Sequence, residues 1–565
     1  METFRSDVFA FANEVVERDA ALDPIFATEA GVGGHDERLP DFSPDGVAES
    51  FEATNEAFAR LDLLRASDDV DRVALAVLRE RLGTRRSLFA SHEWGRLCSV
   101  ISSPLSNTRQ AFELMGSSSD EEREVVATRL KAVRPAMAGW RRQLIELADT
   151  ELLPSRRHIV GIADQAATYS EGSFRRYVEA VAPELGAEDR MVRAARDADA
   201  ACGELSEWMR HDLAPRANEM DFCGEDRYLV WAKDYMGAAL DLSELYDWGW
   251  EDLRRINERM WEIAKSLVPG AITLTEVVDF LDHDPARFID GTDELLARLR
   301  SFTDAAVDRL DGVHFDIDPR VRFCDVRLAP EGGAAAPYYF PPSEDLSRPG
   351  TTWYPTLGAT TFSWWESAST WYHEGVPGHH LQCGAAIVAA DRQSRFQRLA
   401  GWTSGYGEGW ALYAERLCEE LGFFEDPGEE LGYLAGQALR AARVVVDIGM
   451  HLQKRAPKDL GELGRLGDCS GRVWTPEMAV TLLVERALQS PAMAASEVER
   501  YLGIPAQAIS YKVGERVWLR AREETRQRLG EDFSLKRFHS FALDLGPMGL
   551  DPLEAELRNW SGATN

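Results

Sequence analysis

Apolar residues recur three and four positions apart along most of the chain, with charged residues between them. This spacing is typical of helices that bury one face. Before residue 320 the segments with this pattern, rich in Ala, Leu, Glu and Arg, are 1–20, 46–91, 119–150, 173–215, 238–266 and 288–312. After residue 390 they are 395–422, 429–455, 475–500, 505–529 and 534–544. Asp-Pro, Gly-Gly and Ser-Pro stretches between segments predict loops, and the polar residues 28–45 predict an irregular crossing.

The pattern changes between residues 321 and 355. Residues 321–328 alternate apolar and polar side chains as a strand does, and residues 336–340 and 351–355 predict two more strands around a proline-rich loop. A helix then begins near Ser363. An exposed edge of such a sheet can bind an extended peptide by main-chain hydrogen bonds, and a purely structural role is the alternative.

These patterns predict a mainly α fold, a multi-helix body with a small β-sheet next to the helix that begins near Ser363. Residues 1–315 are expected to form a helical N-terminal part, and residues 316–565 contain the sheet and the later helices. Helical enzymes can exceed the usual domain length of roughly 100–200 residues as one body. We therefore expect the two parts to be continuous.

The densest cluster of metal-ligand side chains lies in this helix, in the sequence His373-Glu374-Gly-Val-Pro377-Gly-His379-His380. Zinc binds neutral imidazoles and carboxylates, and a hydrolytic zinc site keeps one position open for water. A carboxylate beside the first ligand can take the proton of that water and pass it to the leaving amine, which is the expected role of Glu374. Only 11 histidines occur in 565 residues, so this cluster favours metal binding over an ordinary polar helix face followed by a turn.

The spacing of the cluster differs from the common pattern, in which two histidines at i and i+4 share one helical face. Position i+4 from His373 is Pro377, and His379 at i+6 would point about 240° around a regular helix. Pro377 cannot bond to the carbonyl of His373, and Gly378 tolerates unusual backbone angles, so a break here could return His379 toward His373. His380 at i+7 already faces that way but lies roughly 10 Å along the axis. The spacing alone leaves both as the second ligand.

A second segment supplies a third candidate ligand. Residues 405–416 read Gly-Tyr-Gly-Glu-Gly-Trp-Ala-Leu-Tyr-Ala-Glu-Arg, so Glu408 is enclosed by glycines and a tryptophan. Small residues let helices approach closely, and a carboxylate in such surroundings needs a cation or several donors. Glu415 can share the face of Glu408, and an ordinary surface ion pair is its alternative role.

The two segments together resemble the bacterial domain-of-unknown-function 885 family (DUF885), which belongs to the zincin-type metallopeptidase superfamily. Residues 443–451, 497–514 and 538–547 are similar to further segments of that family, and the resemblance spans roughly residues 320–550. It implies a mostly helical, zincin-like fold, one zinc ion per chain and hydrolysis of a peptide or a similar amide.

The resemblance also implies roles for single residues. His373, His379 and Glu408 would bind zinc, and Glu374 would be the base. We expect Tyr511 or His539, each in a family-like segment, to stabilise the oxyanion that forms on the substrate. Further candidates are His380 and Glu415 beside the ligands, Arg443 and Lys512 for a substrate carboxylate, and Asp447 with His451 as an ion pair or as partners that orient a ligand histidine.

The predicted function is zinc-dependent hydrolysis of peptide bonds by an oligopeptidase or a carboxypeptidase-like enzyme. Hydrolysis of a non-peptide amide and metal binding without turnover are the alternatives. The intact Glu374 argues against metal binding without turnover, because only the reaction needs a base at that position.

Composition limits the classes of partner. The formal net charge of −32 disfavours nucleic acid and anionic membranes, which need basic surfaces. No run approaches the roughly 20 apolar residues of a membrane span, and the N-terminal residues lack the apolar core of a signal peptide. Seven scattered cysteines favour reduced thiols. We therefore expect a cytoplasmic protein that binds a peptide or small amide, with no nucleic acid and no membrane as partner.

Overall fold

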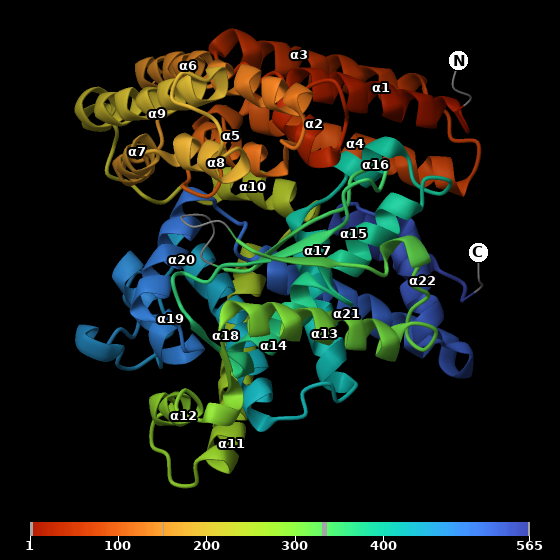
Figure 1. Cartoon of the computed structure of the whole chain (residues 1–565). Helices are drawn as coiled ribbons and strands as arrows, with labels where there is room; N and C mark the ends of the chain where they lie inside the picture. The colour runs from red at the N-terminus through yellow and green to blue at the C-terminus, as the bar shows by residue number, and fades with distance from the viewer. Residues whose placement is uncertain (1–3, 151, 330–335, 563–565) are drawn as a thin grey trace. The chain divides into compact units, whose positions relative to one another are not determined.

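The chain folds into two compact units that are mainly helical (Figure 1), which confirms the prediction of a mainly α fold. This computed structural model describes residues 4–150, 152–329 and 336–562. The first unit contains the residues up to Ser67, Leu78–Val230 and Leu502–Ile504. The second contains Asp68–Val77, Trp231–Tyr501 and the residues from Pro505 onward. Residue 316, where the sequence changes character, lies inside the second unit, and so does every candidate site residue.

The first unit is a helical assembly around an apolar core. Its helices are α1 (Asp7–Leu22), α2 (Pro24–Ala30), α3 (Pro44–Arg60), α5 (Pro104–Ala111), α6 (Asp120–Asp149), α7 (Arg156–Ser170), α8 (Ser173–Val181) and α9 (Arg190–Trp208), and α4 (Asp69–Ala90) and α10 (Glu225–Met236) contribute in part. A capping box between Ser119 and Glu122 starts α6. Helix α9 packs against both α6 and α7, with Leu130, Trp140 and Cys202 among the buried residues.

Two of the predicted helices in this unit are each divided by a new cap. The segment 46–91 forms α3 and α4, because Asp68 accepts a hydrogen bond from the amide of Asp71 (2.9 Å) and starts a second helix. The segment 173–215 divides into α8 and α9, where Asp189 caps the second helix. Helices α2, α5, α7 and α10 are additions to the prediction. Residues 1–3 of the first predicted helix lie outside the described residues.

The second unit is arranged around a buried central helix, α18 (Pro427–His451), which packs against α11, α14 and α19. Most side chains of α18 are buried, as expected for a helix that is apolar on nearly every side. The other helices are α11 (Leu242–Leu267), α12 (Leu274–Leu281), α13 (Thr292–Leu310), α14 (Trp364–Glu374), α15 (His379–Val388), α16 (Arg395–Ala400), α17 (Ser404–Glu420), α19 (Pro476–Ala487), α20 (Pro491–Gly503), α21 (Ser510–Leu529), α22 (Leu535–Leu545) and α23 (Leu550–Asn559).

Two small sheets lie next to these helices. The larger has the order β2 (Asp325–Leu328), β4 (Thr351–Tyr354), β3 (Tyr338–Phe340), with β2 parallel and β3 antiparallel to β4. The smaller pairs β1 (Phe288–Asp290) with β5 (Thr361–Ser363), and β5 runs directly into α14. Val326, Phe362 and Trp371 share one core between sheet and helix. The predicted small β-structure beside this helix is therefore present.

Three predicted helices of this unit have different boundaries in the structure. The segment 288–312 begins as strand β1, and α13 starts only after Gly291, whose φ of 87° breaks the strand from the helix. The segment 395–422 forms α16 and α17, because Thr403 caps a new helix. The segment 475–500 forms α19 and α20, with Leu488 in the left-handed region between them.

Candidate metal centre

A break between α14 and α15 brings His379 back toward His373. The four residues of the break contain a cis peptide bond before Pro377. The carbonyl of Pro377 accepts a hydrogen bond from the indole of Trp410 on α17 (2.9 Å), so the helix that supplies the third ligand also holds the break. A Cβ on Gly378 would lie 1.9 Å from the carbonyl oxygen of His373, so only glycine fits there.

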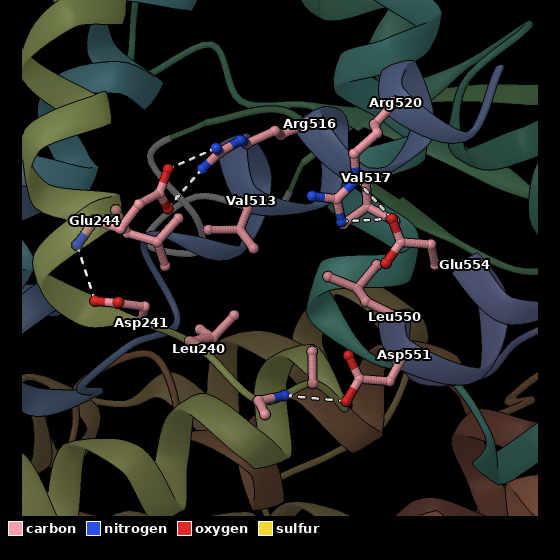
Figure 2. A pocket seen from close by; sticks show the side chains of 13 residues that line it. Leu240, Asp241, Glu244, Val513, Arg516, Val517, Arg520, Leu550, Asp551 and Glu554 are labelled. Atoms are coloured by element: carbon pink, nitrogen blue, oxygen red, sulfur yellow. Dashed lines mark hydrogen bonds and ion pairs between the residues drawn. The ribbon is translucent and has the colours of Figure 1, made fainter. Parts of the chain in front are cut away.

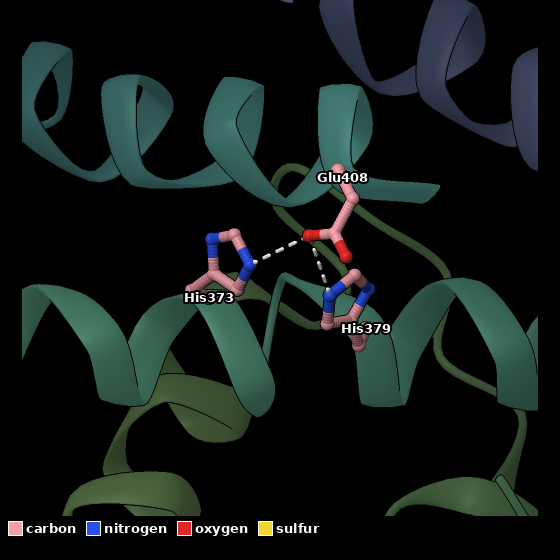
Figure 3. Close-up of side chains that lie close together, drawn as sticks. All are labelled: His373, His379 and Glu408. Carbon is pink, nitrogen blue, oxygen red and sulfur yellow. Dashed lines mark hydrogen bonds and ion pairs between the residues drawn. The ribbon is translucent and has the colours of Figure 1, made fainter. Parts of the chain in front are cut away.

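Three candidate ligand side chains converge where these helices face α17 (Figure 3). Oε2 of Glu408 lies 3.2 Å from Nε2 of His373 and 3.4 Å from Nε2 of His379. One ligand atom from each side chain lies within 4.8 Å of the other two, and the imidazole planes cross at 89°. Two imidazoles and a carboxylate at this spacing have the chemistry of a three-ligand site for a divalent cation.

The electrostatics of the cluster favour a positive charge at its centre. Burial alone would raise the pKa of Glu408, but hydrogen bonds from His373 and His379 hold it well below its usual value. Burial alone would lower the pKa of His373, but hydrogen bonds to Glu408 and Glu415 raise it to about 9. The site is therefore built to stabilise a buried cation, whether a proton or a metal ion.

Glu415 is the outer partner of His373. Its Oε1 lies 2.7 Å from Nδ1 of His373, and its other oxygen accepts a hydrogen bond from Ser369. Burial alone would raise the pKa of Glu415, but Arg440 and His373 keep it below its usual value. The ionised carboxylate accepts the Nδ1–H and so holds the ring with Nε2 facing Glu408. A surface ion pair, the alternative role, does not apply because Glu415 is fully buried.

Close packing of α17 against α21 brings Tyr511 to the cluster. A Cβ on Gly514 would lie 2.1 Å from the carbonyl oxygen of Gly405, and a Cβ on Gly409 would lie 2.4 Å from the Cα of Gly514. The glycines around Glu408 therefore let a second helix approach, as predicted from their size. Tyr511, one turn before Gly514, stacks on His373 with ring centroids 6.1 Å apart.

The hydroxyl of Tyr511 is available at this position. Among the described residues it makes no hydrogen bond. Burial and the charge of Glu408 raise the pKa of Tyr511, while Arg443, Arg500 and Arg440 oppose them. A protonated hydroxyl held beside a ligand histidine can donate to an oxyanion.

Glu374 ends α14 directly after the first ligand. Its side chain is buried, with 8% of the residue exposed, and makes no hydrogen bond to any described residue. Burial raises the pKa of Glu374, although His373 and His379 counteract this rise. A carboxylate with a raised pKa and uncommitted oxygens is suited to accept and return a proton.

His380 is directed away from the ligand cluster. Its Nε2–H donates to the carbonyl of Val321 (2.9 Å), and its Nδ1 accepts from the hydroxyl of Tyr339 on β3 (3.0 Å). Burial lowers the pKa of His380 to about 4, so the ring is neutral. Both nitrogens are committed, so the structure places His379, and not His380, in the candidate ligand set.

Two predicted site residues lie outside the cluster. His539 donates from Nδ1 to the carbonyl of His314 (3.1 Å) and accepts at Nε2 from Tyr413 (2.7 Å). The Lys512 ammonium is bonded to Glu515, Asp252 and Gln437. The structure does not bring His539, the predicted oxyanion donor, or Lys512, the predicted substrate ligand, to the cluster, because other side chains and backbone groups bind their polar atoms.

Asp447 and His451 also have structural partners. Asp447 accepts from the amide of Ala506 (3.0 Å), and His451 donates to the carbonyl of Tyr501 (3.0 Å). Their closest side-chain atoms are 3.6 Å apart. They therefore hold the connection between α20 and α21, and they do not orient a ligand histidine.

Two arginines of α18 flank Tyr511. The guanidinium carbon of Arg443 lies 4.6 Å from the centre of the Tyr511 ring, and that of Arg440 lies 5.9 Å away. Arg443 is bonded to Glu497 (2.7 Å). Arg440 was missed from the sequence, although its position one turn before Arg443 in an otherwise apolar helix was a usable signal.

A separate cavity of about 270 Å³ lies between α11, α21 and α23 (Figure 2). Its lining includes the apolar side chains of Leu240, Val513 and Leu550. Its arginines pair with glutamates, Arg516 with Glu244 and Arg520 with Glu554. Its two aspartates accept hydrogen bonds from backbone amides. Paired charges at a rim need no ligand, so the ligand cluster remains the candidate site.

Solved structures similar to this chain share its fold. The putative lipoprotein from Colwellia psychrerythraea is 20% identical with a TM-score of 0.82, and the alignment covers 98% of each chain. A putative lipoprotein of unknown function from Shewanella oneidensis is 18% identical with a TM-score of 0.71, over 98% of this chain and 100% of the other. No curated protein matches the sequence.

The expectation of a cytoplasmic location is contradicted by this comparison, because both similar proteins are described as lipoproteins. A lipoprotein is held at a membrane by its lipid, so the lack of a membrane-spanning helix among the described residues does not argue for the cytoplasm. No disulfide joins the seven cysteines in the described part of the chain, and no helix there is long and apolar enough to cross a bilayer.

The family comparison covers nearly the whole sequence. The family described as bacterial protein of unknown function (DUF885) matches residues 24–557. The match therefore includes the helical N-terminal segments, whereas the motifs that resemble the family lie between about residues 320 and 550. The chain therefore belongs to the DUF885 family.

Proposed function

We propose that this protein is a zincin-type, zinc-dependent hydrolase of peptide bonds, with one ion held by His373, His379 and Glu408. The observation that carries the proposal is the convergence of these three side chains within 4.8 Å, although they come from three helices. The donor set of two imidazoles and one carboxylate is the one that catalytic zinc sites of this class use. The anchoring of His373 by the buried Glu415 supports it further, since ligand histidines usually have such a partner.

Zinc, when bound, would polarise the substrate carbonyl and lower the pKa of water at the site. Glu374 accepts the proton of the attacking water at its carboxylate and later donates it to the leaving amine. Tyr511 donates its hydroxyl hydrogen to the oxygen that becomes negative. Glu415 keeps the His373 ring oriented throughout.

A sheet edge beside the cluster supports a peptide as the substrate. Among the described strands β3 pairs only with β4, so its other edge lacks a strand partner. Tyr339 on β3 stacks near His379, with ring centroids 6.5 Å apart. A substrate bound along β3 by main-chain hydrogen bonds would pass close to Glu374 and the ligands.

The proposal is tested with the zinc-loaded protein and a panel of short peptides and blocked non-peptide amides. Glu374→Gln should retain zinc and lose on the order of a thousandfold or more in kcat. Glu366→Gln, at the other end of α14, is the matched control and should keep its rate. Full activity in the Glu374→Gln variant would refute the proposed base. Turnover of the amides alone would refute the peptide substrate.

A further inference from the structure

Arg440 is a nearly buried cation that lacks a close partner. Its side chain is 13% exposed, and the nearest carboxylate oxygen, on Glu415, lies 3.6 Å from its Nη2. Its Nε is buried, and the guanidinium makes no hydrogen bond to any described residue. Glu415 already accepts from His373 and Ser369. Leaving the buried Nε–H of this guanidinium without an acceptor is costly, and its terminal nitrogens have donors left for a further group.

Arg440 lies close to the candidate site, next to Tyr511 and Glu415. Its guanidinium carbon is 5.9 Å from the Tyr511 ring, which is 6.1 Å from the ring of His373. Its charge acts on Glu374 and on Tyr511, and it lowers the pKa of both, although burial dominates in each case. The side chain is thus within electrostatic reach of the proposed base and the proposed oxyanion donor.

A second guanidinium adds to the positive charge. Arg443 shares the carboxylate of Glu497 with Arg500, at 2.7 Å and 3.1 Å. One acid therefore serves two arginines, and Nη1 of Arg443 and Nε of Arg500 are buried without a hydrogen-bond partner. Around Tyr511 the three guanidinium groups face Glu497, the already committed Glu415 and Glu408. The buried guanidinium nitrogens that lack a hydrogen-bond partner, among them Nε of Arg440 and Nη1 of Arg443, favour an anionic ligand here.

We propose that Arg440, assisted by Arg443, binds a free carboxylate of the substrate next to the scissile amide. Arginine binds a carboxylate through two parallel N–H···O bonds, which fixes both position and orientation. The substrate class is then peptides cleaved near a free C-terminus, or N-acyl amino acids. This inference rests on the proposed hydrolase function and specifies its substrate.

The test is a binding measurement in the zinc-loaded Glu374→Gln variant, which does not require turnover. The probes are N-benzoyl-glycyl-phenylalanine and its C-terminal amide, titrated by calorimetry. The free acid should bind on the order of 10–100-fold more tightly than the amide, as expected for a charge-assisted hydrogen-bonded pair. Adding Arg440→Gln to this variant should remove that difference, because it should weaken the binding of the free acid and leave the binding of the amide unchanged.

Two further variants separate recognition from a structural effect. Arg440→Lys keeps the charge beside Glu415 but loses the planar pair of donors, so most of the preference for the acid should disappear while zinc content is unchanged. Arg526→Gln removes an exposed arginine of α21 and should keep the full preference. Melting temperature and metal content of each variant check the fold and the site.

The outcomes distinguish this inference from the proposed function. Equal affinity for acid and amide, no binding of either, or an unchanged preference in Arg440→Gln would overturn the carboxylate subsite. Hydrolysis of both probes at equal rates by the unmodified enzyme would also overturn the subsite and leave the hydrolase standing. If the acid binds in a way that depends on Arg440 but no peptide is hydrolysed, the carboxylate subsite is supported and the proposed hydrolase function is refuted.

Discussion

The outer partner of His373 offers a quantitative test of the metal centre. Glu415 is fully buried, and its carboxylate lies 2.7 Å from Nδ1 of His373. Glu415→Gln preserves the size of the side chain and an oxygen that can accept the Nδ1–H, but it removes the charge. The imidazole then becomes a weaker base and a weaker ligand.

The size of the effect follows from the kind of interaction. Loss of the outer partner of a ligand histidine typically weakens metal binding 10–100-fold, which corresponds to about 1.4–2.7 kcal/mol. We expect the loss of zinc affinity in Glu415→Gln to lie near the lower end of this range, because a neutral hydrogen bond to His373 remains. Glu415→Ala should lie near the upper end, because it removes that bond and also leaves Arg440 without its nearest acid, which is 3.6 Å away.

The assay is competition for zinc between each variant and a chromophoric chelator near neutral pH. Glu419→Gln is the matched control, since Glu419 is one turn further along α17 and pairs with Arg259 (2.6 Å), away from the ligands. That variant should bind zinc as the unmodified protein does. Equal affinity of Glu415→Gln and the unmodified protein would refute the role assigned to Glu415.

Three further variants test the packing around the site. Gly514→Ala should destabilise the fold by roughly 1–3 kcal/mol in urea unfolding, because the new methyl group overlaps the backbone of α17. Lys512→Met should cost about 1–3 kcal/mol, since Glu515 and Asp252 each lose one cation but keep Arg416 and Arg255 as partners, yet zinc affinity should be unchanged. Burial lowers the pKa of His539 to about 3, so the unfolded chain binds the extra proton first and stability falls as pH drops below about 6.5. His539→Gln should remove about 2 kcal/mol of the stability loss between about pH 7 and pH 5, measured by urea unfolding at both values.

Each of these variants has a clear contradicting result. An unchanged unfolding free energy for Gly514→Ala would mean that α17 and α21 are not in close contact. Loss of zinc in Lys512→Met would place that residue in the site after all. An identical fall in stability toward low pH in His539→Gln would show that this histidine is not a buried neutral group.

The candidate site was predictable where local chemistry determined it. His373, Glu374 and Glu408 stand out because metal-ligand side chains are concentrated there and because glycines on both sides of Glu408 indicate close helix packing. The break at residues 375–378 was also readable, since proline and glycine interrupt a helix wherever they occur together. The same reasoning predicted the mainly helical fold with a small sheet ahead of α14.

The remaining assignments depended on contacts between distant segments. His379 and His380 are adjacent in sequence, and only the carbonyl of Val321 and the hydroxyl of Tyr339 decide that His380 turns away. His539 looked like a site residue, but its ring is bound by groups from two other segments. Arg440 carries no local motif, and its lack of a close partner is visible only in three dimensions. The predicted helix boundaries differ from the structure where a single capping residue, such as Asp68, starts a new helix.

The most direct test is the metal content of the purified protein, measured by elemental analysis after incubation with zinc and removal of excess ion. The account predicts about one zinc ion per chain in the unmodified protein and in His380→Gln, and far less in His379→Ala. No bound metal in the unmodified protein, or equal zinc in His379→Ala, would contradict it.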